Sequence, residues 1–142
     1  MNKHVATSAF NTALDQAEPA FGKFFMAKFL GLRVGFGEDF CRIDFDCNDY
    51  MFNPQGTLHG GVIAFVQDVS MGHLIHHLTG KGGTTLEMKT QFTNRVDAGP
   101  VRCEGRFLKR GRQLSFMESR LWNAEDKLAA VSTATWLMPA TG

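Results

Sequence analysis

The last third of the chain alternates between apolar and polar residues with the period of two that is typical of β-strands. In residues 85–92 the alternation places Leu86 and Phe92 on one face and Thr85 and Lys89 on the other. Similar alternation recurs in three later segments, which are separated by turn-forming residues. We therefore predict four strands, over residues 85–92, 101–110, 113–123 and 128–137.

The centre of the chain has a different pattern. From Leu58 to Leu78, apolar residues fall on nearly every side of a helical projection, which is typical of a buried helix. Pro54 and Gly56 predict a loop before this helix, and the glycine-rich residues 80–83 predict another loop after it.

The first third of the chain predicts two helical segments and two short strands. Pro19 separates helical patterns over residues 9–17 and 20–29, because proline interrupts a helix. Gly31 is expected to end the second helix. Residues 32–36 and 40–46 then have strand character.

These elements predict an α+β fold. One long central helix, wrapped by an antiparallel sheet of five to six strands, buries the apolar faces of both kinds of element. The chain has 142 residues, enough for a sizeable core, so we expect a single domain over residues 1–142. Its N-terminal helical extension covers about residues 1–30.

Composition excludes several classes of function. The net charge of +1 gives no general attraction to nucleic acid or to an anionic membrane, so an anionic ligand must be held by local basic residues. No apolar run reaches the roughly 18 residues of a membrane span, and Met1 to Thr7 lacks the pattern of a signal peptide. Cytoplasmic location is the expectation. Three cysteines without metal-site or redox spacing predict buried, reduced thiols.

Asp68 is the one acidic residue between Gly60 and Leu78. A carboxylate among apolar residues is costly unless it is paired or hydrogen-bonded, and such carboxylates concentrate at functional sites. Asp68 is therefore a candidate catalytic group. The alternative is an exposed position, or a hydrogen bond to nearby backbone.

His59, Gly60 and Gly61 open the central helix. Two glycines at a helix start allow a substrate to approach backbone N–H groups, which carry the positive end of the helix dipole and stabilise an oxyanion. Tight packing is the alternative reason for the two glycines.

Gly60 and Asp68 are too far apart to act on one carbonyl within one chain. Eight residues of helix span about 12 Å at 1.5 Å per residue. If both groups act on one carbonyl, they come from different subunits, and a symmetric dimer with antiparallel central helices would bring them together. The catalytic interpretation therefore predicts a homo-oligomer with shared active sites.

These residues resemble a known family. Asn53-Pro-Gln-Gly-Thr-Leu-His59-Gly60-Gly61, followed by Asp68, resembles the signature of hotdog-fold acyl-CoA thioesterases. The likeness is strongest to the phenylacetate-degradation (PaaI-like) branch, which includes the mammalian thioesterase superfamily member 2 group. It covers roughly residues 49–137. The resemblance also implies a dimer of dimers.

The resemblance implies a role for each matching residue. The Gly60 N–H would polarise the thioester carbonyl, and Asp68 of the neighbouring subunit would be the nucleophile or the general base. Asn53 would support the site from the loop before the helix. Thr85 falls where the family carries a Ser or Thr that holds the attacking water. His59 matches the motif and is expected to support the helix start rather than act as a base, whereas His73, His76 and His77 are expected at the surface or an interface.

Coenzyme A needs basic side chains for its phosphates. Lys109, Arg110 and Arg112 are the densest basic cluster, and the family likeness favours them over the alternative of a solvated hairpin tip. Gly61 is expected to contact the substrate beside Gly60, and Arg95 is a second phosphate candidate. Coenzyme A is part of the substrate, and we predict no metal or other cofactor.

Phenylalanine is abundant, with 13 among 142 residues. Phe21, Phe24, Phe25 and Phe29 are expected either in the core or in an acyl pocket that favours aromatic or medium-chain groups. The predicted reaction is hydrolysis of acyl-CoA to acid and free CoA. Alternatives are a hotdog hydratase or dehydratase, an acyl-CoA-binding module, and a purely structural oligomer.

Overall fold

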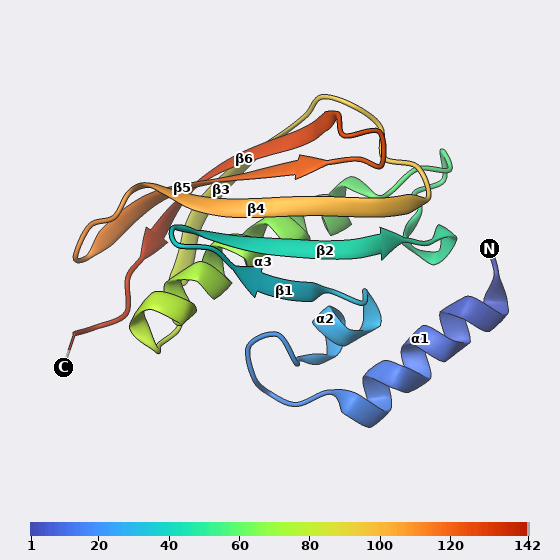
Figure 1. Ribbon diagram of the computed structural model, residues 1–142, viewed down its shortest axis with the longest axis horizontal. Coiled ribbons are helices and arrows are strands. Elements are labelled where there is room, and N and C mark those ends of the chain that lie inside the picture. The colour runs from blue at the N-terminus through green and yellow to red at the C-terminus, as the bar shows by residue number, and fades with distance from the viewer. Residues whose placement is uncertain (142) are drawn as a thin grey trace.

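The computed structural model describes residues 1–141 and consists of one antiparallel sheet that curves around a long helix (Figure 1). The strands run in the order β1-β2-β4-β5-β6-β3, so β1 and β3 form the two edges. The helices are α1 (Lys3–Gln16), α2 (Phe25–Phe29), the 3-10 turn η1 (Asp49–Met51) and α3 (Gly60–Thr79). The strands are β1 (Arg33–Phe36), β2 (Phe40–Cys47), β3 (Thr84–Phe92), β4 (Gly99–Lys109), β5 (Leu114–Trp122) and β6 (Leu128–Leu137). This is the hotdog architecture, and the predicted α+β class is confirmed.

Helix α3 packs its apolar residues against the concave face of the sheet. It ends at Gly80, whose φ of 73° is left-handed and whose N–H donates to the His76 carbonyl. The side chains of α3 and the sheet form one core, in which Val66, Met71 and Leu74 are fully buried. The predicted central helix is confirmed with its start at residue 60 rather than 58.

A polar network fixes α3 against the sheet. The fully buried Gln67 donates to the Ser119 carbonyl oxygen at 3.0 Å and accepts from Ser132 Oγ at 2.6 Å. Ser70 Oγ lies 2.8 Å from Ser119 Oγ. Because a buried polar group without a partner costs about 1–3 kcal/mol, the network favours one position of α3 relative to β5 and β6. Asp68, the next residue after Gln67, is thereby held in place.

The N-terminal helices differ from the predicted ones. Helix α1 begins at Lys3, six residues before the predicted start, because Asn2 Oδ1 caps it by accepting from the Val5 N–H. The predicted helix over residues 20–29 is wrong at its start, since α2 begins only at Phe25. Residues 18–24 form turns, in which Gly22 has a left-handed φ of 75°.

Strand β3 carries a bulge that reverses part of the predicted alternation. Thr85 pairs with Trp136 and Glu87 pairs with Thr135, which leaves Leu86 as the extra residue. Leu86 is consequently 52% exposed, and Thr85 turns toward the concave face. The prediction that Thr85 and Lys89 share one face is therefore wrong, because a β-bulge shifts the side-chain alternation by one residue.

The three cysteines are free and buried, as predicted. Burial raises the pKa of Cys41 and of Cys103 to about 12, and that of Cys47 to about 11. Thiols with such pKa values are almost entirely protonated at neutral pH and are poor nucleophiles. The three cysteines are therefore poor candidates for a reacting group, and the candidate site is sought among other side chains.

Candidate active site

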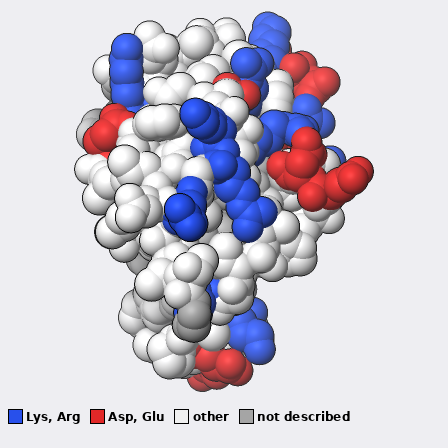
Figure 2. Space-filling view, turned by 90° about the vertical axis from the view of Figure 1, so that its left-hand side faces the viewer, with Lys and Arg blue, Asp and Glu red and all other residues white. Residues whose placement is uncertain are grey.

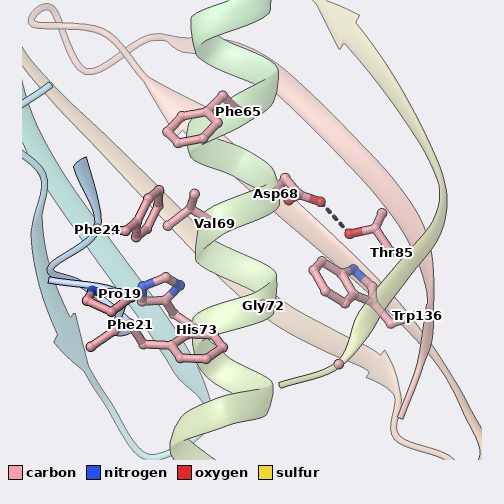
Figure 3. Close-up of a pocket in the computed structure, with 12 residues that line it drawn as sticks. Pro19, Phe21, Phe24, Phe65, Asp68, Val69, Gly72, His73, Thr85 and Trp136 are labelled. Atoms are coloured by element: carbon pink, nitrogen blue, oxygen red, sulfur yellow. Dashed lines mark hydrogen bonds between the residues drawn. The ribbon is translucent and has the colours of Figure 1, made fainter. Parts of the chain in front are cut away.

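A cavity of about 550 Å³ opens between the middle of α3, the start of β3 and the N-terminal segment 18–24. Figure 3 shows Asp68, Thr85 and Trp136 on one side of α3, and Pro19, Phe21 and Phe24 on the other. The remaining lining residues come from α3, from segment 18–24 and from the residue before β3: Phe65, Val69, Gly72, His73, Ala20 and Gly83.

Asp68 and Thr85 are directly bonded in this cavity. Thr85 Oγ1 donates to Asp68 Oδ1 at 2.7 Å, while Asp68 itself is half-buried (Figure 3). The bulge in β3 makes the contact possible, because it turns Thr85 to the concave face. One carboxylate oxygen is thus engaged by the threonine hydroxyl, and no protein donor binds the other within residues 1–141.

A second cavity, of about 370 Å³, contains other residues of the predicted site. It lies at the N-terminal end of α3 and is lined in part by Asn53, Gly60, Phe92 and Arg95. Asn53 Oδ1 accepts from the backbone N–H groups of Gln55 and Thr57, at 3.0 and 3.2 Å. Asn53 therefore holds the loop before α3 in shape.

The start of α3 presents one free amide. His59 Nδ1 accepts from the Gly61 N–H at 2.8 Å and so caps the helix. This bond occupies the Gly61 amide, and the contact of Gly61 with substrate stays a prediction. The Gly60 N–H has no acceptor within the described residues 1–141, and Gly60 lines the second cavity.

The structure therefore divides the predicted catalytic residues into two groups. Asp68 and Thr85 line the first cavity, whereas Asn53 and Gly60 line the second, and no residue lines both. The two groups occupy different turns of α3, as the sequence spacing requires. Each cavity thus contains one of the two groups of residues that the sequence singled out.

Comparison with known proteins identifies the family. The family model described as "Thioesterase superfamily" matches residues 55–130, more than half of the chain. This protein belongs to the thioesterase superfamily. The matched segment includes the start of α3, Asp68 and Thr85.

Relatives of this thioesterase-superfamily protein are spread over several organisms. A candidate esterase of Saccharolobus solfataricus is 27% identical over 94% of this chain and 86% of its own length. The BH2602 protein of Bacillus halodurans, solved with CoA, shares the fold with a TM-score of 0.84 at 17% identity, over 99% of this chain and 94% of that one. A candidate thioesterase of Ralstonia eutropha, described as a phenylacetic acid degradation-related protein, shares the fold with a TM-score of 0.75 at 24% identity, over 92% of this chain and 99% of that one.

The basic residues predicted for CoA lie outside both cavities of the superfamily member. Lys109, Arg110 and Arg112 are exposed at the turn between β4 and β5. Figure 2, which views the end of the molecule where this turn lies, shows a band of Lys and Arg side chains running down the face. Arg95 instead lines the second cavity and pairs with Asp97 at 2.7 Å.

Two residues of the first cavity were missed by sequence reasoning. Trp136 is 4% exposed and faces Thr85 across the β3–β6 pair. His73 was predicted at the surface or an interface, but it is only 6% exposed, so that prediction is wrong within this chain. Its Nε2 accepts from the Gly22 N–H at 2.8 Å, and its ring meets Phe21 edge to face. The position of His73 one turn after Val69 on α3 was a signal for the inward face.

The stability of this superfamily member should fall when the pH drops below the ordinary histidine range. Burial lowers the pKa of His73 from 6.5, opposed by a hydrogen bond with the Val69 backbone and reinforced by His76. The unfolded chain then binds a proton at higher pH than the folded protein does. The contribution of His73 is therefore complete above about pH 6.5 and is lost as the pH falls toward the lowered pKa.

Urea unfolding at about pH 7.5 and about pH 5 tests this expectation. His73→Gln should show a smaller loss of unfolding free energy between the two conditions than the wild type. His77→Gln is the matched control, because His77 is exposed and stacks on Phe36. Equal pH dependence in the wild type and His73→Gln would contradict the prediction.

Within residues 1–141, no group of three or more His, Cys, Asp or Glu side chains is placed to hold a metal ion. No helix in the same range is long and apolar enough to cross a membrane.

Proposed function

We propose that this protein hydrolyses acyl-CoA thioesters to the free acid and CoA. The observation that carries the proposal is the Thr85–Asp68 hydrogen bond of 2.7 Å at the wall of an apolar cavity. A carboxylate with one oxygen fixed and the other available suits either a nucleophile or a general base. Coenzyme A arrives with the substrate, and the proposed reaction uses no further cofactor.

The active site is shared between two copies of the chain. Strand β3 is an edge strand with β6 as its one neighbour, so its outer backbone groups are available to a second β3. A two-fold axis beside β3 would place the Gly60 end of one α3 against the Asp68 segment of the other. Each site then combines Asn53 and Gly60 of one chain with Asp68 and Thr85 of its partner. Two such dimers form the expected tetramer.

The reaction follows from these positions. The Gly60 N–H, at the positive end of the α3 dipole, donates to the thioester carbonyl oxygen and stabilises the oxyanion that develops there. Asp68 either attacks the carbonyl or removes a proton from water. His59 and Asn53 keep the Gly60 amide in position through the helix cap and the loop before it.

The CoA phosphates bind the basic turn between β4 and β5. Lys109, Arg110 and Arg112 are exposed there, and Arg110 lies over the ring of Phe107 at 5.7 Å. Guanidinium groups bind phosphate oxygens in pairs, which favours the two arginines over isolated lysines. The Bacillus halodurans protein of similar fold was solved with CoA, which supports CoA as part of the substrate.

The acyl group occupies the first cavity. Phe21, Phe24 and Phe65 line it, whereas Phe25 and Phe29 pack against Phe10, away from it. An aromatic cavity of about 550 Å³ suits aromatic or medium-chain acyl groups. This preference agrees with membership of the phenylacetate-degradation (PaaI-like) branch.

Phenylacetyl-CoA should be hydrolysed with a kcat/KM at least about 10-fold higher than that of acetyl-CoA. Transfer of a phenyl group into an apolar cavity contributes about 1.5–3 kcal/mol, and each 1.4 kcal/mol is a factor of 10. Octanoyl-CoA should fall in the same high range. A preference for acetyl-CoA would refute the assignment of the acyl cavity.

Release of free thiol from a panel of acyl-CoA esters tests the proposed function itself. The expected result is turnover that saturates with substrate concentration. Hydration of enoyl-CoA without thiol release would indicate a hydratase. Saturable binding of acyl-CoA with neither reaction would indicate a binding module.

A further inference from the structure

The indole of Trp136 is a buried hydrogen-bond donor without an acceptor. Its side chain is 4% exposed, and Nε1 has no partner within the described residues 1–141. Indole N–H can only donate, and a buried donor of this kind normally has a partner. A second buried nitrogen without a hydrogen-bond partner in this range, Arg102 Nε, belongs to a guanidinium that lies over the Trp122 ring, 4.6 Å from its centroid.

Trp136 lies beside the candidate catalytic pair. It is the register partner of Thr85 in the β3–β6 ladder, and both residues line the first cavity with Asp68. Figure 3 shows the indole nitrogen on the edge of the ring nearer to Thr85. The opposite edge of the ring is held by α3, where a Cβ at Gly72 would come within 2.9 Å of it. The glycine therefore allows the indole to sit against the helix with its N–H turned toward the site.

The other polar side chains of the cavity are already engaged. Thr85 Oγ1 gives its hydrogen to Asp68, and His73 accepts from the Gly22 N–H and bonds the Val69 backbone. Among the described side chains that line the cavity, those left for a ligand are the Trp136 N–H, the lone pairs of Thr85 Oγ1 and the second oxygen of Asp68. A water molecule has two hydrogens and two lone pairs, and it matches this set.

We propose that Trp136 Nε1–H holds the hydrolytic water of the thioesterase reaction. This inference rests on the proposed function and deepens it. The water donates one hydrogen to Asp68 and the other to Thr85 Oγ1, and it accepts from Trp136. Its remaining lone pair points at the thioester carbonyl carbon.

The step is balanced without any further reactant. The water oxygen forms a bond to the carbonyl carbon, its proton passes to Asp68, and the carbonyl electron pair moves to the oxygen that the partner subunit's Gly60 binds. Collapse of this intermediate breaks the C–S bond. The leaving thiolate takes the proton from Asp68, which yields acid, CoA thiol and the starting carboxylate. Asp68 therefore acts as a general base and forms no anhydride.

Removal of the indole N–H tests the inference in the full-length protein. Trp136→Phe should lower kcat by about 10- to 100-fold for every acyl-CoA, with KM changed by less than about 2-fold, because the lost bond acts on the attacking water. Trp122→Phe is the matched control and should leave kcat unchanged, since Trp122 lies in neither cavity. Benzothienylalanine at position 136 keeps the shape but replaces N–H with sulfur, and it should lose as much activity as phenylalanine.

The outcomes separate this inference from the proposed function. Wild-type kcat in Trp136→Phe, or restoration of activity by benzothienylalanine, would overturn the role of the N–H and leave the thioesterase proposal intact. The absence of thiol release by the wild type would overturn both. Single turnover in ¹⁸O-water gives an independent reading: label in the product acid alone supports the held water, whereas label in Asp68 would overturn it.

Discussion

Asp68→Asn is expected to lower kcat for acyl-CoA hydrolysis by at least about 10³-fold. The amide has the size of the carboxylate and can still accept a hydrogen bond from Thr85, so the fold and the cavity should persist. It can neither take a proton from water nor attack a carbonyl. The measurement is thiol release under saturating substrate, together with the dissociation constant of a non-hydrolysable acyl-CoA analogue.

Asp15→Asn is the control for this substitution, because Asp15 is an exposed carboxylate on α1. It should leave both kcat and ligand affinity unchanged. Asp68→Asn should alter affinity by no more than about 3-fold. Near-wild-type kcat in Asp68→Asn would remove Asp68 from the mechanism.

Gly60→Pro is expected to lower kcat by about 10²- to 10³-fold, the usual effect of losing one oxyanion donor. Residue 60 is the first residue of α3, a position where proline fits a helix and its missing N–H breaks no helical bond. Gly60→Ala is the matched variant, because it adds the same Cβ, 3.2 Å from the Phe92 ring, but keeps the N–H. Gly60→Ala should therefore retain most of the activity, while Gly60→Pro should not.

Mixing two inactive variants tests whether the oxyanion donor and the base come from different subunits. A dimer of one Asp68→Asn chain and one Gly60→Pro chain contains one site with both groups intact and one with both lost. Co-expression in equal amounts should restore about a quarter of wild-type activity, since about half of the dimers are mixed. Activity that stays at the level of the separate variants would place both groups in one chain.

The fold was largely predictable because its pattern is strong. An apolar helix from residue 60 and four alternating strands after it follow from periodicity alone. Asp68 stood out for the same reason, as an acid within an apolar segment. The glycines at residues 60 and 61 pointed to the helix start, and the spacing to Asp68 pointed to two separate halves of a site.

The rest depended on features that periodicity does not encode. A bulge at Leu86 reversed the face on which Thr85 lies, and a one-residue irregularity leaves no mark in an alternating sequence. His73 is buried against a segment far from it in the sequence, where the N–H of Gly22, 51 residues earlier, donates to its ring. Trp136 became a candidate only when its pairing with Thr85 and its unpartnered N–H were visible.

Segment 18–24 has a consequence for how this protein can diverge. It supplies Pro19, Phe21 and Phe24 to the proposed acyl cavity, yet it belongs to no strand of the sheet and contributes none of the proposed reacting groups. The Gln67 network fixes α3 without involving it. On the proposed function, part of the acyl cavity is thus encoded in a stretch of sequence separate from the reacting groups. Replacing residues 18–24 with the corresponding segment of a relative is expected to change the acyl preference and to leave Asp68, Thr85 and Gly60 in place.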